Sequence, residues 1–569
     1  MNIGSAAFSN KLAITSVAIP NNTTNLGTNS FYLCTGLTNI SFGTGLLSIN
    51  HGAFYGCKQL ASVTIPNTVR SLGSNVFNQC VGLTNVGIGS VVTNLGTSVF
   101  QACSNLASVA IPNSVTNIEA YSFKSCVSLA SIALGGNVRA IGNSAFQDCS
   151  ALSMITIPNS VKYIGSYAFS SCASLTNSTL ETGVVNIGYD AFSSCSNLAS
   201  IIVPDSTTNL AWGVFAACTK LQTAVIGNHV PTLSGTFINC WGLTNVTIGT
   251  NVTNIDIAFS DCYSLTSVFL PASVTNIGFP AFRDCTSLLA INVASANPAY
   301  VSVDGVLFDK AQKKLLRFPV GRGGSYTIPD SVTSFAYAFW DNSSLTNVMI
   351  GSGVTNVGYA PFDPGTSLEN IDVSPLNPAY LSLNGVLFDK SRTTLLRFPP
   401  ARSTSYVIAA GVTTLAEEAF DFSAILNSVT IPASTTNLQS SVFAFCPNLL
   451  AVTFLGNAPN YVDDVTLFFG DTNTTVYYLP GTTGWNSTFG GRLSVLWNPQ
   501  ATALNHTNGH FGFNITGPTN AVIVVEACTN FVNPIWLPVS TNTLTTGVSS
   551  FSDSQSSNYP SRFYRFRSP

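Results

Sequence analysis

Charged side chains are scarce in this sequence of 569 residues. Asp, Glu, Lys and Arg together make up 8% of it, with 21 basic and 24 acidic residues. Typical soluble domains carry about 25% of such residues. Proteins that bind nucleic acid through positive charge need clustered Lys and Arg to contact the phosphates. The composition therefore disfavours a nucleic-acid partner.

Long hydrophobic runs are also missing. No stretch of about 18 consecutive apolar residues occurs, so no transmembrane helix is expected. Hydrophobic residues nevertheless make up 46% of the chain, enough for a large core, which argues against disorder. The polar residues are mainly Asn, Ser, Thr and Gly, which suit turns and solvated strands better than helices.

The usual sequence signatures of catalysis are lacking too. There is no metalloprotease, phosphate-loop, dinucleotide-binding or nucleophile-elbow motif, and no C-x₂-C zinc spacing. The adjacent carboxylates Glu417-Glu418 and Asp463-Asp464 are expected to point in different directions, whereas a catalytic pair must face one pocket. The sequence therefore predicts no enzymatic activity, no cofactor and no metal site. The four histidines are scattered: His51, His229, His506 and His510.

A repeat dominates the sequence. Phe residues lie 23 positions apart from Phe31 to Phe215, and spacings of 22, 22 and 23 lead on to Phe282. The recurring string is L-x-x-h-x-h-P-x-x-V-x-x-I-G-x-x-A-F-x-x-C, where h is apolar. So regular a period predicts a solenoid of stacked units that share one core. Further anchors at Phe8, Phe339, Phe362, Phe420 and Phe443 bring the total to seventeen.

Each unit predicts two short strands and a corner. Residues 60–65 alternate apolar and polar, the mark of a half-buried strand, and Pro66 ends it. Residues 69–72 form a second extended element. Residues 74–80 are expected to form a short helical or 3₁₀ corner that directs Phe77 and Cys80 inward.

The cysteines favour a structural role. Of 14 cysteines, 13 occupy the same position of the repeat, and only Cys528 lies outside it. Neighbouring thiols in such a column would point inward in parallel, whereas a disulfide needs converging β-carbons. We expect buried, reduced thiols that pack as small hydrophobic groups.

Two related inserts interrupt the period and divide the chain. Each contains Asn-Pro-Ala-Tyr and then Asp304-Gly305 or Asn384-Gly385, which are type I′ hairpin signals between apolar residues. The last segment is expected to be a small β-sandwich that serves as an anchor or as a passive cap. The expected organisation is repeats at 1–294, a hairpin insert at 295–328, repeats at 329–373, a second hairpin insert at 374–408, last repeats and cap at 409–498, and the sandwich-like module at 499–569.

The inserts concentrate positive charge beside Tyr300 and Tyr380. Two interpretations remain open for this basic ridge. It is either a solvated hairpin surface whose charges prevent edge-to-edge aggregation, or a docking site for an acidic glycan or protein. Its members are Lys310, Lys313, Lys314, Arg317, Arg322, Lys390, Arg392, Arg397 and Arg402.

The predicted strands offer a second candidate surface. At the outward position between the two apolar residues, most units carry small or polar side chains, but Ile202, Val225, Phe269 and Met349 are apolar. Exposed apolar patches often mark interaction sites. A neighbouring loop or an insert could equally cover these residues, so both interpretations stay open.

The repeat resembles the BspA-like, or treponemal-type, leucine-rich repeats of bacterial surface proteins. Units such as 157–161, Ile-Pro-Asn-Ser-Val, followed by 168–172, Ala-Phe-Ser-Ser-Cys, carry the resemblance, which covers about residues 1–498. It implies a secreted or cell-surface protein, with adhesion or matrix binding in some members. Four units depart from the pattern and are expected to pack less tightly, because Lys11, Asn342, Gly365 and Ser423 replace Cys.

The sequence thus leads to two functional hypotheses. The first is a non-enzymatic extracellular binding scaffold that contacts a protein or glycan through the solenoid surface and the basic inserts. The second is a structural subunit that self-associates end to end into filaments or layers. Met1 opens in the middle of a unit and no signal peptide is visible, so a fragment or a late gene start is expected.

Overall fold

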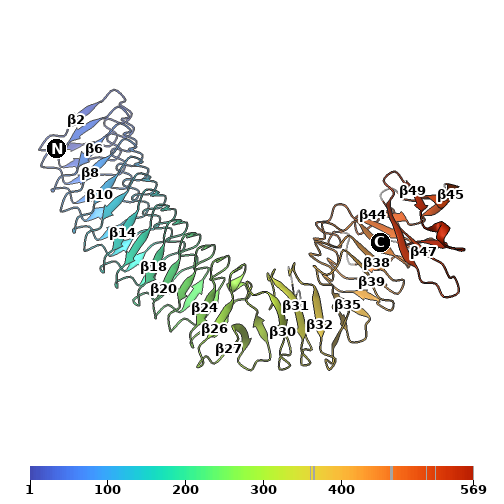
Figure 1. Cartoon of the computed structure of the whole chain (residues 1–569). Helices are drawn as coiled ribbons and strands as arrows, with labels where there is room; N and C mark the ends of the chain where they lie inside the picture. Colours follow the sequence, from blue (N-terminus) through green and yellow to red (C-terminus); the bar gives the residue numbers. More distant parts are fainter. Residues whose placement is uncertain (359–360, 363–364, 462–464, 508, 519–520, 568–569) are drawn as a thin grey trace. The chain divides into compact units, whose positions relative to one another are not determined.

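A computed structural model describes residues 1–358, 361–362, 365–461, 465–507, 509–518 and 521–567, which are folded almost entirely as short strands and turns (Figure 1). The chain divides into two compact units. The first contains Met1–Gln312 with Arg317–Gly321, and the second contains Lys313–Leu316 with Arg322–Pro569.

In the first unit every repeat contributes one strand to each of two parallel rows, here called the front and back strands. The front strands hold the L-x-x-h-x-h segment and the back strands hold the V-x-x-I segment. Partners are equivalent residues of successive repeats, for example Ser62 with Asn85 and Ser71 with Asn94. The solenoid predicted from the 23-residue period is confirmed.

The front strands are β2 (Ser16–Ala18), β4 (Asn39–Ser41), β6 (Ser62–Thr64), β8 (Asn85–Gly87), β10 (Ser108–Ala110), β12 (Ser131–Ala133), β14 (Met154–Ile157), β16 (Asn177–Leu180), β18 (Ser200–Val203), β20 (Thr223–Ile226), β22 (Asn245–Thr247), β24 (Ser267–Leu270) and β26 (Ala290–Val293). The back strands are β1 (Asn2–Ile3), β3 (Asn25–Leu26), β5 (Ser48–Ile49), β7 (Ser71–Leu72), β9 (Asn94–Leu95), β11 (Asn117–Ile118), β13 (Ala140–Ile141), β15 (Tyr163–Ile164), β17 (Asn186–Ile187), β19 (Asn209–Leu210), β21 (Thr232–Ser234), β23 (Asn254–Asp256) and β25 (Asn276–Ile277).

Most described corners are runs of turns rather than the expected short helix. Around Phe77, backbone N–H groups alternate between two uses. Those of Asn75, Phe77 and Gln79 donate to carbonyls of the next repeat at 2.8–2.9 Å. Those of Asn78 and Cys80 donate to the residue three positions back, as in a 3₁₀ turn. Asn75 and Gln79 have positive φ (59° and 61°), which turns their N–H groups toward the neighbouring repeat.

Because alternate residues serve the neighbouring repeat, no continuous helix forms at most corners. Among the described residues, only η1 (Phe279–Phe282) at one corner and η2 (Ser556–Asn558) near the end are 3₁₀ helices. The corners thus contain hydrogen bonds of the predicted 3₁₀ type, but most of them form no helical segment.

The anchor phenylalanines form a continuous stack through the first unit. From Phe8 to Phe282 the centroids of neighbouring rings lie 5.0–5.8 Å apart and the rings are stacked. Such offset pairs add to the gain from burying the rings. Each ring needs a ring of the next unit to be covered, so the stack exists only in the assembled solenoid.

Beside this stack runs the column of cysteines, all free and buried as expected. Each thiol in the column donates a hydrogen bond to the carbonyl of the anchor Phe of the preceding repeat. Examples are Cys80 Sγ to Phe54 O at 3.1 Å and Cys126 Sγ to Phe100 O at 3.1 Å. Cysteine suits this position because it is small, apolar and a weak donor.

The predicted hairpins of the two inserts are present. In the first insert β27 (Tyr300–Val303) pairs with β28 (Val306–Asp309), and in the second β33 (Tyr380–Leu383) pairs with β34 (Val386–Asp389). Asp304, Gly305, Asn384 and Gly385 all have positive φ, so both turns are of type I′ as predicted. The strands β29 (Leu315–Arg317) and β35 (Thr394–Arg397) follow.

One buried Asn anchors each insert, a role that the sequence did not reveal. Asn297 Nδ2 donates to the carbonyls of Pro271 and Val274, while its Oδ1 accepts from the N–H groups of Ala299 and Tyr300. Asn377 repeats the arrangement in the second insert. Both N–H donors and both acceptor lone pairs of the side-chain amide are therefore hydrogen-bonded.

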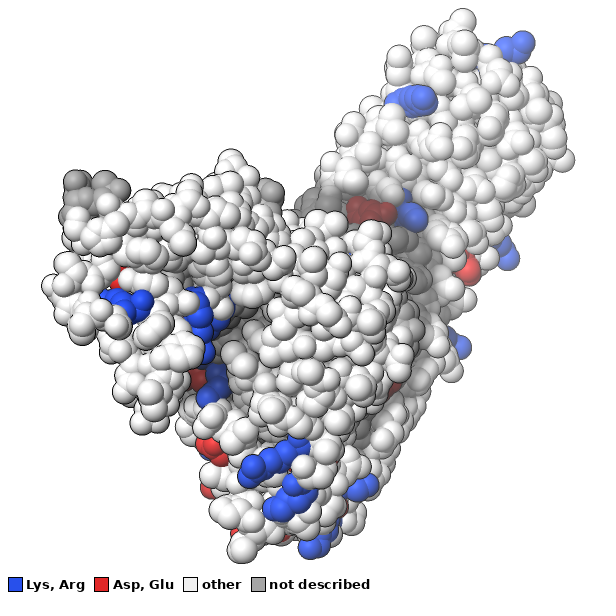
Figure 2. All heavy atoms as spheres, turned by 90° about the vertical axis from the view of Figure 1, so that its right-hand side faces the viewer, with Lys and Arg blue, Asp and Glu red and all other residues white. Residues whose placement is uncertain are grey.

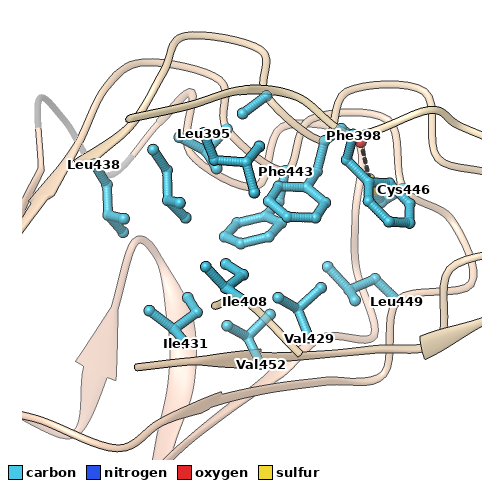
Figure 3. Close-up of a cluster of buried hydrophobic side chains, with 14 of the residues drawn as sticks. Leu395, Phe398, Ile408, Val429, Ile431, Leu438, Phe443, Cys446, Leu449 and Val452 are labelled. Atoms are coloured by element: carbon cyan, nitrogen blue, oxygen red, sulfur yellow. Dashed lines mark hydrogen bonds between the residues drawn. The ribbon is translucent and has the colours of Figure 1, made fainter. Parts of the chain in front are cut away.

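The second unit continues the same arrangement around a core that includes Phe398, Phe443 and Cys446 (Figure 3). Its longer strands are β30 (Gly324–Thr327), β31 (Leu345–Ile350), β32 (Asn370–Val373), β36 (Ser405–Val407), β38 (Ser428–Ile431), β40 (Ala451–Phe454), β42 (Thr475–Tyr478) and β44 (Arg492–Leu496). A two-residue strand, β43 (Thr488–Phe489), pairs with β44. Its short strands are β37 (Thr414–Leu415), β39 (Asn437–Leu438) and β41 (Asn460–Tyr461).

The last segment is all-β and packs on the end of the repeats in the same unit. One sheet is formed by β45 (Gln500–Thr507), β46 (His510–Thr516) and β49 (Val548–Asp553), the other by β48 (Leu537–Thr543), β47 (Val522–Cys528) and β50 (Phe563–Arg567). Its core includes Tyr477 of β42, with Val495 and Trp497 packed against it.

The cysteine column predicts how the solenoid responds to alkali. Burial raises the pKa of Cys80 and of Cys126 to about 12, from an ordinary value of 9.0, with backbone hydrogen bonds acting in the opposite direction. The folded thiols therefore stay protonated between about pH 9 and 12 while unfolded thiols ionise. Stability falls across that window, by up to about 1.4 kcal/mol per pH unit for each thiol.

Replacing Cys80 and Cys126 by Ala should reduce the slope of unfolding free energy against pH by about 2 kcal/mol per pH unit above pH 9. The measurement is urea unfolding of both proteins at pH 7.5, 9.5 and 10.5. Equal slopes in the two proteins would contradict the assigned burial of these thiols.

Candidate functional site

The candidate basic residues of the inserts do not form one uniform surface. Lys310, Lys313, Lys314, Lys390 and Arg392 are exposed, and Arg322 and Arg402 are half-buried. Several bond to the insert itself or to a neighbouring strand. Lys310 Nζ donates to Ser295 O at 3.2 Å, Lys390 Nζ to Asn377 O at 2.5 Å, and Arg402 Nη1 to Asn370 Oδ1 at 2.7 Å.

Arg317 and Arg397 do not belong to the predicted surface ridge, because both are buried, with relative exposures of 5% and 3%. Arg317 Nη2 donates to Phe282 O at 3.2 Å. Arg397 donates to the carbonyls of Glu418 and Asp421, at 2.5 and 3.3 Å. Phe282 is the last anchor before the first insert. In other repeats the anchor carbonyl accepts a hydrogen bond from the Cys of the next repeat, and here Arg317 donates that hydrogen bond instead.

The two candidate tyrosines are also engaged with the fold. Tyr300 and Tyr380 are half-buried, and their hydroxyls donate to Thr275 O at 3.1 Å and Thr355 O at 3.2 Å. These hydrogen bonds connect the start of each hairpin to the neighbouring repeat. The hypothesis that the inserts dock an acidic partner stays a prediction, which now rests on the seven basic residues outside the core.

The difference between buried and exposed arginines can be tested. Arg397→Ala should lower the unfolding free energy of the second unit by about 2–4 kcal/mol, because it leaves buried carbonyls without a charged donor. Arg392→Ala, an exposed position of the same insert, should change it by less than about 0.5 kcal/mol. Urea unfolding and hydrogen exchange at residues 416–423 are the measurements. Similar effects of the two substitutions would contradict the structural role.

Three of the four candidate apolar residues lie on the front strands of the first unit and are exposed. Relative exposures are 62% for Ile202, 39% for Val225 and 56% for Phe269. Ile202 and Val225 are direct partners on β18 and β20, and Val225 is followed by Thr247 on β22. Met349, 38% exposed, lies on β31 in the second unit beside Asp372.

The sequence left open whether a loop or an insert covers these four side chains. In the structure all four are exposed. None of the front strands of the first unit contains Asp, Glu, Lys or Arg, so Ile202, Val225 and Phe269 lie on uncharged strands, whereas Met349 lies beside Asp372. Figure 2 shows one face of the whole molecule, on which charged side chains are few and lie in small groups. The front face is therefore a neutral surface with exposed apolar side chains.

The sequence analysis missed a set of exposed aromatic residues in the first unit. Tyr189 and Trp212 occupy the same corner position in successive repeats, with exposures of 59% and 43%. Tyr163 and Tyr167 lie one repeat earlier, with exposures of 57% and 44%. Tyr163 and Tyr167 occupy other positions of the repeat than Tyr189 and Trp212, so the set as a whole follows no single period.

Buried titratable groups meet in the second unit, around Cys446. Asp421, Asp471 and Arg397 act electrostatically on this thiol, whose pKa burial raises far above its ordinary value. A protonated, buried thiol is a poor nucleophile. The cluster therefore lacks the thiolate that nucleophilic chemistry at Cys446 would need.

Asp471 makes the end of the solenoid sensitive to pH. Burial raises its pKa from 3.8 to about 7, against opposing effects of the Cys446 backbone and Arg492. The folded state thus holds a proton that the unfolded state releases above about pH 4. This contribution to stability is complete below that pH and is lost as pH rises through about 7.

Asp471→Asn should remove this dependence and make the second unit more stable than the wild type at pH 8, by up to about 4 kcal/mol. Asp372→Asn, at an exposed position, serves as the matched control and should leave the pH profile unchanged. Thermal unfolding between pH 4 and 8 measures both. A wild-type profile that rises toward pH 8 would contradict the raised pKa.

The remaining candidate chemistry is limited. Glu417 and Glu418 both border a hollow of about 210 Å³ beside Arg397, and Glu417 Oε1 accepts a hydrogen bond from Ser440. Asp463 and Asp464 lie outside the described residues. Within the part of the chain that the structure describes, no group of His, Cys, Asp and Glu could hold a metal ion, and no helix is long and apolar enough to cross a membrane.

Stacked parallel units with a phenylalanine stack and two strands per turn define a leucine-rich repeat solenoid. The family model described as BspA type Leucine rich repeat region matches residues 1–130, 116–235, 232–301, 324–394 and 397–480. The chain belongs to this family of bacterial-type repeats, as the resemblance of its units implied. No curated protein matches the chain.

Several solved structures are similar to the chain. A leucine-rich cell surface protein from Faecalibacterium prausnitzii is 22% identical over 72% of this chain and 84% of its own, with a TM-score of 0.32. A leucine-rich repeat protein from Bacteroides ovatus is 22% identical over 76% and 83%, with a TM-score of 0.35. The pneumococcal vaccine antigen PcpA is 15% identical over 84% and 80%, with a TM-score of 0.27.

Proposed function

We propose that this protein is a non-enzymatic binding protein of the cell surface or the extracellular medium, and that the front face of its first unit holds a protein or glycan partner. Membership of the BspA-type repeat family supports a binding or adhesion role, and a similar structure carries the description of a cell surface protein. The basic inserts serve as a secondary contact for an acidic part of the partner.

The observation that carries the proposal is the row of exposed apolar side chains at Ile202, Val225 and Phe269. Burying each of them in an interface contributes about 1.5–3 kcal/mol. Most other units place Thr, Ser, Ala or Asn at this position, for instance Thr179 and Thr247 on the adjacent strands. The apolar residues therefore stand out on a face that is otherwise adapted to water.

The neutrality of this face narrows the kind of partner. An ionic partner would lose its hydration on this surface without gaining an opposite charge. A partner that presents hydroxyl and apolar groups, such as a neutral glycan or an uncharged protein patch, loses little. Thr and Asn side chains around the apolar row offer hydrogen bonds to such a partner.

The proposal predicts the effect of a triple substitution. Ile202→Thr, Val225→Thr and Phe269→Thr together should weaken binding at least tenfold, because they remove apolar contact while keeping the residue that neighbouring units use. The measurement is biolayer interferometry against a panel of neutral and acidic glycans and of fibronectin, fibrinogen and laminin.

A matched control replaces exposed apolar residues elsewhere in the same unit, Leu47→Thr, Val91→Thr and Val127→Thr, and should leave binding within about twofold. The proposal fails if no panel member binds or if both triple variants bind like the wild type. Open-ended, concentration-dependent assembly in sedimentation velocity that the first triple variant leaves unchanged would instead support the subunit that self-associates end to end.

A further inference from the structure

The terminal β-module is closed along one side and open along the other. Its two sheets meet at β48 and β49, where Ser549 Oγ donates a hydrogen bond to Asn542 Oδ1 at 3.4 Å. At the opposite side lie β45 and β50, which are the outer strands of their sheets among the residues that the structure describes. The apolar interior of the module is therefore accessible between β45 and β50.

A groove of about 340 Å³ lies on this open side. Its lining includes Ala501 and Leu504 of β45, Phe511 and Phe513 of β46, and four consecutive residues of β50, 563–566. Consecutive residues of a strand point to opposite faces of its sheet. The groove therefore follows the edge of β50 rather than one of its faces.

The inward side of β45 lacks cover at this groove. Ala501 is the partner of Ile515 on β46, and directly opposite residues of a sheet point to the same face. Ile515 is fully buried in the core of the module, whereas Ala501 is exposed. Leu504, which also lines the groove, is 67% exposed. An apolar group placed in the groove would cover both residues of β45.

The two arginines that line the groove are paired with carboxylates of the same module. Arg562 Nε contacts Asp553 Oδ2 at 3.0 Å, and Arg565 Nη2 contacts Glu526 Oε2 at 2.7 Å. An ionic ligand would lose its hydration here without gaining an unpaired opposite charge. The groove therefore favours an uncharged, apolar occupant.

An exposed apolar loop adjoins the groove. It comprises residues 529–536, which connect β47 to β48, and none of them is charged or lines the groove. Relative exposures are 64% for Phe531, 87% for Val532 and 76% for Ile535. Large exposed apolar groups that lie together mark interaction sites. The rings of Phe531 and Phe563 lie 4.9 Å apart, so the loop and the groove form one continuous surface.

Contacts within the module hold this loop in shape. Asn530 Oδ1 accepts hydrogen bonds from two backbone N–H groups of the loop, at 2.9 and 3.3 Å. Trp536 contacts Phe531 edge-on, and the guanidinium of Arg565 lies 4.6 Å from the centre of the indole. A loop fixed in this way loses little conformational entropy when its apolar tip is buried by a partner.

We propose that the terminal modules of two copies of this chain associate around a two-fold axis, with the loop of each copy in the groove of the other. A two-fold interface needs a self-complementary patch, because each copy contributes both halves of every contact. The convex loop and the concave groove meet this need, since both are apolar and they adjoin at Phe531 and Phe563. The interface buries Val532 and Ile535 of one copy beside Leu504 of the other.

This interface differs from end-to-end stacking of solenoids in the size of the assembly. A reciprocal contact is complete with two copies, whereas head-to-tail contacts continue into filaments. The test measures the mass of the full chain by sedimentation velocity and light scattering between about 1 and 100 µM. A reversible species of twice the chain mass is expected, without larger species.

Variants locate the interface. Val532→Asp together with Ile535→Asp should weaken dimerisation by about tenfold or more, because it forces charge into an apolar groove. Leu504→Lys should do the same from the side of the groove. The matched control is Leu376→Asp together with Val407→Asp, at residues of the second unit that are 83% and 64% exposed, and it should dimerise like the wild type.

Mixing the two kinds of variant tests whether the loop enters the groove. In a heterodimer of the loop variant and Leu504→Lys, an Asp-bearing loop meets a Lys-bearing groove, and an unaltered loop meets an unaltered groove. The mixture should therefore dimerise about tenfold or more tightly than either variant does alone. The triple variant of Ile202, Val225 and Phe269 should dimerise like the wild type, so this inference and the proposed function fail independently.

Four results would overturn the proposal. The first is that the chain stays monomeric at about 100 µM. The second is that the control variant dimerises as weakly as the loop variant, and the third is that the mixture stays monomeric. The fourth is that the monomeric chain binds phosphatidylcholine vesicles through Val532 and Ile535, which would reassign the loop to a lipid surface.

Discussion

Each repeat can bury its apolar side chains only against the repeats on either side of it, and the rest of the structure depends on this constraint. A single unit contributes about one layer of Leu, Val, Ile and Phe, too little for a core of its own. Stacking supplies the missing cover, because equivalent residues meet in register across strands and corners. The phenylalanine stack shows the result, with ring spacings of 5.0–5.8 Å along the first unit.

Stacking also explains the polar groups inside the solenoid. Corners that donate alternate N–H groups to the next unit leave carbonyls facing the core, and the thiols of the cysteine column bond to them. Where an insert interrupts the column, Arg317 bonds to the last anchor carbonyl, and Asn297 closes the turn that starts the hairpin. Buried polar residues therefore mark the places where the repeat needs a partner that it cannot supply itself.

Surface chemistry follows from the same geometry. Because outward positions of neighbouring strands lie side by side, a few substitutions in successive units create a patch such as Ile202 and Val225. At the end of the solenoid the terminal module covers these outward positions at Tyr477 and Val495.

The sequence by itself determined the period, the strands, the two hairpins with their type I′ turns and the buried column of thiols, because each of these is a local pattern that recurs. It also located the exposed row at Ile202, Val225 and Phe269, although it could not tell whether anything covered it. Only the tertiary structure decided that Arg317 and Arg397 are buried, that Asp471 has lost its hydration and that Leu504 and Phe563 share a groove. These facts depend on contacts between residues far apart in the chain, and no local pattern of residue types encodes such contacts.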